Sequence, residues 1–270
     1  MARDERNEHE ELGRFRGVRL RRAELLAEID STNREAFRRV ERADFDEVRD
    51  AGLVLIAERQ TAGHGSRGRA WSDRADKSLA MTALLAWPAD WPLAAATWAG
   101  AIAVADALRE LGLPTRLKWP NDVLVPERAG DAADDRGAAR KIAGILAETR
   151  SPGRVALVAL GIGLNVGQSP SDFPPGFTTA PTSLAMEGRA ATVADAALRL
   201  LHALDRHLGA GPAAIAATFR AGLGLVGQTV ELERADGTIT GRLDALTDDG
   251  VLIVDGIRHH GGHVLALRSI

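Results

Sequence analysis

Long apolar runs separated by polar loops are the feature that most constrains the fold of this chain. Residues 52–60 (GLVLIAERQ) form a continuous apolar run with polar flanks, which predicts a buried strand. Four further segments are strand-like: residues 78–87, 115–122, 141–149 and 154–166. Residues 93–111 have the periodicity and length of a helix that stops at Gly112, and residues 192–221 repeat the helical pattern. The chain is therefore expected to combine a sheet with helices.

The N-terminal part has a different character. Residues 1–20 mix basic and acidic side chains, and we expect them to form a solvated, charged tail. The following RAELLAEIDSTNREAFRRV stretch predicts a strand or short helix and then a second helix, in which Thr32 and Glu35 fit a capping box.

The C-terminal part changes to short alternating segments from Leu225 onward. Turn signals at residues 236–237, 249–250 and 261–262 separate five short strands, which suggests a small β-barrel. The expected division is a tail (1–20), a main domain (21–221) and a C-terminal domain (222–270). Within the main domain, residues 126–140 are rich in Pro, Gly, Asp, Arg and Ala and are expected to form a flexible surface loop.

Composition excludes several kinds of chemistry and location. Lys and Arg number 34 against 37 Asp and Glu, a net charge of −3, which argues against nucleic-acid and membrane-surface binding. The absence of cysteine and tyrosine excludes disulfides, thiolate nucleophiles, Cys-ligated metals and tyrosine acid–base chemistry. The first 22 residues lack the apolar stretch of a secretory signal, and the apolar run 93–105 is too short to span a bilayer. We expect a soluble, cytoplasmic protein.

A glycine-rich basic loop, Gly63-His64-Gly65-Ser66-Arg67-Gly68-Arg69-Ala70-Trp71, follows the first buried strand. Its glycines permit close backbone approach to a ligand, and its two arginines suit phosphate or carboxylate groups. A solvated Gly/Arg hairpin is the alternative interpretation. The loop is not a Walker A motif, because no Gly-Lys-Ser/Thr follows.

Polar residues cluster at the ends of later strands. Lys118-Trp119-Pro120-Asn121-Asp122 ends one strand-like segment, although such a cluster is also typical of a plain strand-to-turn junction. Lys141 enters an apolar strand, where it could snorkel to solvent or neutralise charge at a reaction centre. Gly144 in the same strand indicates close approach by a ligand or a neighbouring backbone. The Gly161–Asn165 segment (GIGLN) is no dinucleotide fingerprint, since no helix follows at the required spacing.

Histidine and serine patterns give little support for other chemistry. His259, His260 and His263 lack acidic companions at ligand spacing and are expected on surface loops, so no metal site is predicted. No Gly-x-Ser-x-Gly motif supports a serine hydrolase.

Taken together and in chain order, five segments resemble the biotin protein ligases: IDSTN (29–33), ERQTAGHGSRGRAW (58–71), LKWPNDVLV (117–125), KIAGILAE (141–148) and GIGLNV (161–166). The resemblance covers about residues 24–270. It implies an α+β fold, with a mixed-sheet biotin/lipoate-ligase-like catalytic domain and a C-terminal SH3-like β-barrel. It also implies formation of biotinyl-5′-AMP from biotin and Mg²⁺-ATP, followed by transfer of biotin to a lysine of a biotin carboxyl carrier domain.

The resemblance assigns roles to individual residues. Lys141 would bind the biotin carboxylate and the α-phosphate, and Asp122 would stabilise or deprotonate the incoming carrier lysine. Biotin would further contact Ser31, Thr32, Asn33, Gln60, Gly63, His64, Gly65, Ser66 and Gly144. ATP and the adenylate would contact Arg67, Arg69, Trp71, Lys118, Asn121 and Asn165.

The chain departs from the family pattern in two places. His64 and Ser66 stand where family members usually have arginines, and the 126–140 loop is longer than usual. A carboxylase carrier domain is the expected partner, with the protein a monomer or weak homodimer and no N-terminal DNA-binding module. A lipoate-type acyl ligase and a non-catalytic biotin-binding regulator are the alternative functions.

Overall fold

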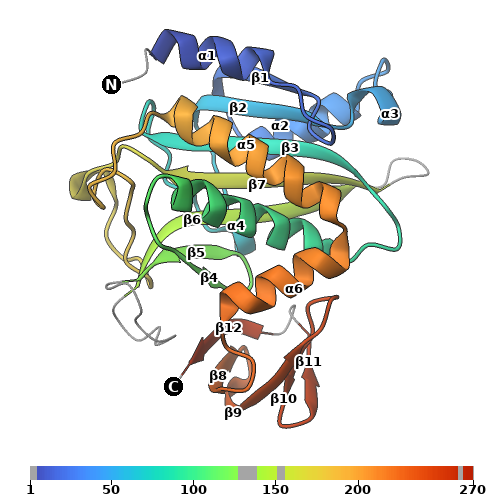
Figure 1. The fold of residues 1–270 in the computed structure, drawn as a ribbon, viewed down its shortest axis with the longest axis vertical. Coiled ribbons are helices and arrows are strands. Elements are labelled where there is room, and N and C mark those ends of the chain that lie inside the picture. Colours follow the sequence, from blue (N-terminus) through green and yellow to red (C-terminus); the bar gives the residue numbers. More distant parts are fainter. Residues whose placement is uncertain (1–4, 127–138, 151–155, 261–263, 270) are drawn as a thin grey trace.

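A seven-stranded mixed sheet forms the centre of the computed structural model, which describes residues 5–126, 139–150, 156–260 and 264–269 (Figure 1). The strand order is β1-β2-β3-β7-β6-β5-β4. The bounds are β1 (Arg22–Ile29), β2 (Leu53–Gln60), β3 (Ser78–Trp87), β4 (Arg116–Lys118), β5 (Asp122–Val125), β6 (Arg140–Arg150) and β7 (Ala156–Asn165). Only β1 and β2 pair in parallel; the other neighbours are antiparallel. The α+β prediction with a mixed sheet is confirmed.

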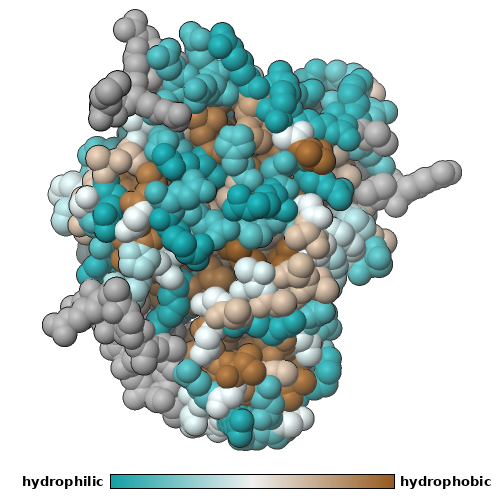
Figure 2. All heavy atoms as spheres, in the orientation of Figure 1, coloured by the Kyte–Doolittle hydropathy of each residue, from teal (hydrophilic) through white to brown (hydrophobic). Residues whose placement is uncertain are grey.

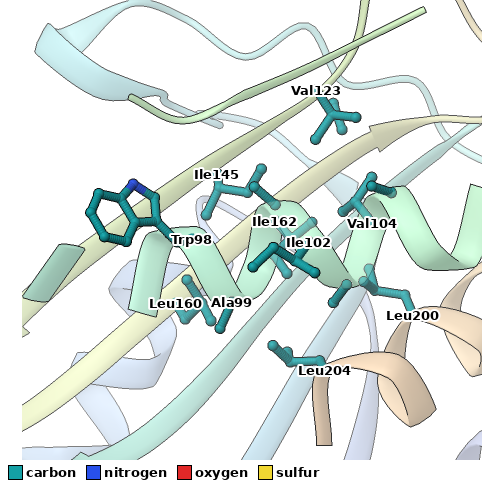
Figure 3. Close-up of a cluster of buried hydrophobic side chains, with 14 of the residues drawn as sticks. Trp98, Ala99, Ile102, Val104, Val123, Ile145, Leu160, Ile162, Leu200 and Leu204 are labelled. Carbon is teal, nitrogen blue, oxygen red and sulfur yellow. The ribbon is translucent and has the colours of Figure 1, made fainter. Parts of the chain in front are cut away.

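One face of the sheet is covered by α4 (Leu93–Glu110) and α5 (Val193–Ala210), with α6 (Pro212–Leu223) beside them (Figure 1). Ile102 of α4 lies between the sheet residues Ile145 and Ile162 and the α5 residue Leu204 (Figure 3). Trp98, near the start of α4, stacks on Phe219 of α6. Many buried positions of α4 are alanines, which lets the helix pack closely on the strands. The outer surface over α5 is mostly hydrophilic, whereas paler and more apolar residues lie over α6 (Figure 2).

The other face is covered by α2 (Thr32–Val40) over part of its area, next to the short α3 (Glu47–Asp50). Phe37 and Val40 of α2 pack against Leu84 of β3 and Leu157 of β7, in a second hydrophobic cluster. Ser31 caps α2 but makes no side-chain capping bond, so the predicted Thr32–Glu35 capping box is wrong. Thr32 already lies inside the helix, where its hydroxyl is directed to Gln60 instead.

The predicted N-terminal tail is wrong, because much of it is folded onto the main domain. Residues Glu5–Arg14 form α1, which contacts α5, and Leu12, Phe15 and Leu20 are buried. After α1, the chain is held by Asp205 of α5. Its carboxylate accepts the backbone N–H groups of residues 18, 19 and 20 at 2.9, 2.7 and 2.7 Å.

Replacement of Asp205 by alanine is expected to destabilise the fold by about 2–3 kcal/mol, because three backbone donors lose a charged acceptor. The melting temperature should fall by roughly 5–10 °C. Asp248→Ala, which removes an exposed carboxylate paired with Arg220, is the control and should change it far less. Equal melting temperatures for the two variants would show that Asp205 does not anchor residues 18–20.

The C-terminal residues form a separate five-stranded antiparallel sheet of order β11-β10-β9-β8-β12. Its strands are β8 (Thr229–Arg234), β9 (Gly237–Leu246), β10 (Leu252–Val254), β11 (Ile257–His259) and β12 (Val264–Ser269). The five predicted strands are therefore confirmed. No pairing between β11 and β12 closes the sheet within the described residues, so the barrel remains a prediction. His259 is buried on β11, contrary to the predicted surface loop.

The remaining predictions on elements have mixed outcomes. The helix over 93–111 is confirmed as α4, and Gly112 follows it with a φ of +72°. The predicted helical region 192–221 is two helices, since Gly211 (φ +84°) and Pro212 interrupt it. Most of the predicted loop 126–140, the turn at 261–262 and His263 lie outside the described residues. Within the described ranges, no helix has the length and apolar character needed to cross a membrane.

Candidate active site

A hollow on the α2 side of the sheet gathers most of the predicted site residues, and its floor is made of glycine. Strand register places Gly144 of β6 opposite Gly163 of β7, and Gly163 opposite Ala80 of β3. Two residues along the strands, Gly161 of β7 lies opposite Leu146 of β6 on one side and Thr82 of β3 on the other. Successive side chains of a strand alternate between faces, so these glycines leave the backbone open on one face. The hollow encloses about 1130 Å³, part of it open to solvent.

A buried polar cluster forms one end of the hollow. The Thr82 hydroxyl oxygen lies 2.7 Å from the Thr32 hydroxyl oxygen and 2.6 Å from Asn33 Oδ1. Thr32 donates to Gln60 Oε1 from both its backbone N–H (2.9 Å) and its hydroxyl (3.1 Å). Asn33 Nδ2 donates to Glu148 Oε2 at 2.7 Å. Hydroxyl groups can rotate to suit a ligand, so this end can both donate and accept hydrogen bonds.

Two aspartates outside the hollow hold the backbone of residues in this polar cluster. The Asp73 carboxylate accepts the Gln60 backbone N–H at 2.5 Å, and burial raises the pKa of Asp73. Asp30 accepts the Ser31 N–H at 2.8 Å, while hydrogen bonding to Arg38 lowers the pKa of Asp30 to about 2. Asp30 therefore stays ionised at neutral pH and holds the chain where α2 begins.

An ion pair lies at the other end of the hollow. Lys141 Nζ is 2.5 Å from Asp122 Oδ1 and 5.9 Å from the centre of the Trp71 ring. A β-bulge directs the lysine into the hollow: Val123 pairs with Ala143 and Leu124 with Lys141, so Ile142 is the extra residue. Strict alternation from Gly144 would place residue 142 on the hollow side, but the bulge puts Lys141 there instead.

Asn165 and Asn121 line the hollow but are already bonded to the protein. Asn165 Nδ2 donates to the Thr182 carbonyl at 2.8 Å, and its Oδ1 accepts from Gln168 at 3.1 Å. Asn121 Nδ2 donates to the Ile145 carbonyl at 2.7 Å. Asn165 thus has both ends of its amide engaged in holding the wall of the hollow.

The glycine-rich loop covers the hollow, and its side chains point in different directions. His64 Nε2 lies 3.4 Å from Glu148 Oε2, and Arg69 donates to the Ser66 hydroxyl at 3.1 Å. Trp71 lies on the glycine floor, since a Cβ on Gly163 would be 2.4 Å from its ring. Arg67 turns away, with φ +60°, and donates to the β12 carbonyls of residues 264 and 265 at 2.7 and 3.0 Å.

The structure brings together fourteen of the predicted residues around the hollow: Ser31, Thr32, Asn33, Gln60, His64, Gly65, Ser66, Arg69, Trp71, Asn121, Asp122, Lys141, Gly144 and Asn165. Three others do not line it. Gly63 lies behind Gln60, Lys118 is on the edge strand β4, and Arg67 reaches the C-terminal sheet. In this structure the β12 carbonyls take the hydrogen bonds of the Arg67 guanidinium, and the contact of Arg67 with a nucleotide stays a prediction.

Sequence reasoning missed several lining or supporting residues, namely Thr82, Glu148, Gly161, Gly163, Phe173 and Phe177. Gly161 and Gly163 carried a detectable signal, because two glycines at a spacing of two fall on one face of a strand. Thr82 gave none, since a threonine inside an apolar run is an ordinary strand residue. Across the described residues, no group of three or more His, Asp or Glu side chains could hold a metal ion.

Replacement of Arg67 by alanine is expected to loosen the glycine-rich loop. Losing two hydrogen bonds from a charged donor should raise amide hydrogen exchange over residues 63–71 about tenfold, equivalent to about 1.4 kcal/mol. Amides of β12 should exchange faster too, because the same contact holds both segments. Arg268→Ala is the control, since Arg268 is on β12 but pairs with Glu233 rather than the loop. Unchanged exchange in the loop would mean that Arg67 does not hold it.

Comparison with known proteins identifies relatives of this chain. The model of the biotin/lipoate A/B protein ligase family matches residues 25–165. A biotin–[acetyl-CoA-carboxylase] ligase of Mycobacterium tuberculosis is 36% identical over 87% of this chain and 84% of its own length. The bifunctional ligase/repressor BirA of Bacillus subtilis is 28% identical over 76% of this chain, and the match spans 62% of that protein.

Solved structures support the fold. The biotin protein ligase of Aquifex aeolicus, in complex with biotin and ATP, superimposes with a TM-score of 0.69 at 24% identity. The match covers 92% of this chain and 99% of that protein. At this level of identity the likeness concerns the fold alone.

Proposed function

Because the chain belongs to the biotin/lipoate A/B protein ligase family, we propose that it is an ATP-dependent biotin protein ligase. It activates biotin to biotinyl-5′-AMP and transfers the biotinyl group to a lysine of a biotin carboxyl carrier domain. The observation that carries this function is one hollow with a polar cluster at one end and the Lys141–Asp122 pair at the other.

The polar cluster favours biotin over lipoate. Biotin ends in a ureido group that donates and accepts hydrogen bonds, whereas the dithiolane ring of lipoate has no N–H or carbonyl group to pair. A ligand that left Thr32, Thr82 and Gln60 without partners would incur the cost of burying unpaired polar groups. We therefore propose that Ser31, Thr32 and Asn33, with Gln60, surround the ureido ring, while the chain of biotin runs toward Lys141 beside Trp71, whose ring covers Gly144 and Gly163.

Lys141 is placed to support the first chemical step. The biotin carboxylate attacks the α-phosphorus of ATP, the bond to the β-phosphate oxygen breaks, and pyrophosphate leaves. Both reacting groups are anionic, so the ammonium of Lys141 would hold them together and stabilise the charge that develops. In the free protein this ammonium pairs with Asp122 at 2.5 Å.

Asp122 is placed to support the second step. Once Lys141 turns to the acyl phosphate, the Asp122 carboxylate is free to accept a hydrogen bond from the incoming carrier lysine. That amine attacks the biotinyl carbonyl, AMP leaves, and the amine proton passes to Asp122 or solvent. A carboxylate that already contacts one ammonium has the charge to contact a second.

The nucleotide is proposed to occupy the side of the hollow near Arg69, Phe173 and Phe177. Phe177 is partly exposed and Phe173 meets it edge to face, which provides an apolar wall for a base. Because the described residues offer no carboxylate cage, Mg²⁺ would enter as part of the Mg-ATP substrate, held by phosphate oxygens and water.

The finer organisation also belongs to this proposal. We place the catalytic region within 21–221, extended at its start by α1, and an SH3-like C-terminal domain at 222–270. A biotin carboxyl carrier domain is the protein substrate. A cytoplasmic location, a monomeric or weakly dimeric state and the absence of nucleic-acid binding remain predictions.

Pyrophosphate release by the purified chain with biotin and Mg-ATP tests this function. We expect release that depends on biotin and is not supported by lipoate, followed by biotin transfer when a carrier domain is added. Activity with lipoate alone would favour the lipoate-type ligase. Tight biotin binding without pyrophosphate release would instead identify a non-catalytic binding protein.

A further inference from the structure

A short segment at residues 180–182 runs beside the start of β6, and its backbone forms hydrogen bonds with the backbone of Lys141. Lys141 N–H donates to the Ala180 carbonyl at 2.7 Å, and Thr182 N–H donates to the Lys141 carbonyl at 2.8 Å. The other side of the lysine adjoins the bulge at Ile142, where the ladder with β5 is interrupted. A bulge weakens local pairing, so the direction of the Lys141 side chain depends strongly on the 180–182 segment.

Glu187 fastens this segment to β6. Its two carboxylate oxygens accept Arg140 Nε and Nη2, both at 3.0 Å, in a bidentate pair. The same carboxylate accepts the hydroxyl of Thr182, which is fully buried. Arg140 precedes Lys141 in the chain, and Thr182 bonds to the Lys141 carbonyl. One carboxylate, only 12% exposed, therefore holds a residue on each side of the Lys141 backbone.

The segment is anchored on its far side as well. Asn165 of β7 donates to the Thr182 carbonyl at 2.8 Å, so Thr182 connects β6 to β7 at the edge of the glycine floor. Glu187 itself does not line the hollow, and its oxygens are engaged by Arg140 and Thr182. Any influence of Glu187 on the reaction must pass through the residues that it holds.

We propose that Glu187 is a positioning residue that aims Lys141 at the reacting carboxylate and phosphate through the Arg140–Glu187–Thr182 cluster. The proposal rests on the role of Lys141 in the proposed ligase activity. Ground-state binding of biotin relies mainly on the polar cluster at the opposite end of the hollow, so it should be much less sensitive to the Arg140–Glu187–Thr182 cluster. Charge stabilisation in adenylate formation needs the ammonium within a narrow range of positions and should be sensitive.

The test is steady-state pyrophosphate release by Glu187→Gln and Glu187→Ala in the full chain. We expect kcat to fall about tenfold for the glutamine variant and further for alanine, because a small misplacement of a catalytic group is costly. KM for biotin should change less than about twofold, because uniform binding is untouched. Arg140→Gln should resemble Glu187→Gln, and the double variant should lose little more than either single one.

The matched control lies at the opposite end of the same strand. Glu41 pairs with Arg150, the last residue of β6, and Glu41→Gln removes a more exposed Arg–Glu ion pair far from Lys141. We expect its kcat to equal that of the unmodified chain. Circular dichroism and melting curves identify any variant that is partly unfolded, and kcat is then expressed per folded molecule.

The outcomes separate this inference from the proposed function. Biotin-dependent release by the unmodified chain, with an unchanged kcat in folded Glu187→Gln, would overturn the positioning role alone. The positioning role would also be overturned if Glu187→Gln kept its kcat and lost kcat/KM only through a higher KM for biotin, because the variant would then have lost binding rather than positioning. An unmodified chain that released no pyrophosphate with biotin would overturn the proposed function and, with it, this inference.

Discussion

Lys141→Met is expected to lower adenylate formation by roughly a thousandfold while leaving the fold intact, because removing one preorganised charge from a reaction centre costs about this much. Methionine keeps most of the length of the lysine stem, so the change isolates the ammonium group. The lost charge would otherwise lie between a carboxylate and a phosphate, which repel each other when unshielded. The measurement is single-turnover formation of biotinyl-5′-AMP, with biotin binding followed separately.

Biotin affinity provides the internal control for this variant. The polar cluster that we assign to the ureido ring lies at the other end of the hollow, so affinity should fall by less than about tenfold. Lys141→Arg should recover part of the rate, since the charge returns in a different shape. Near-normal adenylate formation by folded Lys141→Met would contradict the assigned role.

Gly161→Val is expected to weaken biotin binding by roughly a hundredfold or more. A Cβ at this position would lie 2.5 Å from Asn33 Oδ1, which is closer than real contacts allow. Asn33 would have to leave the position in which it bonds to Thr82 and Glu148, and the polar cluster would lose its arrangement. Disrupting two or more hydrogen bonds at about 1–1.5 kcal/mol each accounts for an effect of this size.

Titration calorimetry with biotin measures the effect, and Gly167→Ala is the matched control. The nearest atoms to a Cβ on Gly167 would be those of Lys77, at 3.5 Å or more, which is ordinary contact. Its biotin affinity should match that of the unmodified chain. Unimpaired binding by Gly161→Val would mean that the ureido ring lies elsewhere in the hollow.

Much of the fold could be predicted because its signals are local. The run at 52–60 and the helix that stops at Gly112 carry their own periodicity, and both are confirmed as β2 and α4. The N-terminal helix was missed because charged residues dominate its composition. Leu12 in this helix and Phe15 just after it are buried by tertiary contacts, and the helix packs on α5, which is about 190 residues away in the chain.

The sequence could predict which residues form the site, but not the directions in which their side chains point. Ordered motifs identified most of the lining, yet motifs do not tell where a side chain points. Arg67 and Arg69 are equivalent as charges in the sequence, but only Arg69 lines the hollow, because a left-handed backbone turns Arg67 toward β12. The bulge at Ile142 has no sequence signal of its own, and it decides that Lys141 faces the ligand side.

The close packing of α4 beneath the strands has a consequence for how ligands leave. Ile145 and Ile162 alternate along β6 and β7 with Gly144, Gly161 and Gly163, so the floor of the hollow is the upper side of a densely packed layer. Such a layer yields little on the timescale of ligand exchange. Residence time should therefore be governed by the opening of the covering loop at 63–71, and substitutions there should change the dissociation rate far more than substitutions beneath the sheet.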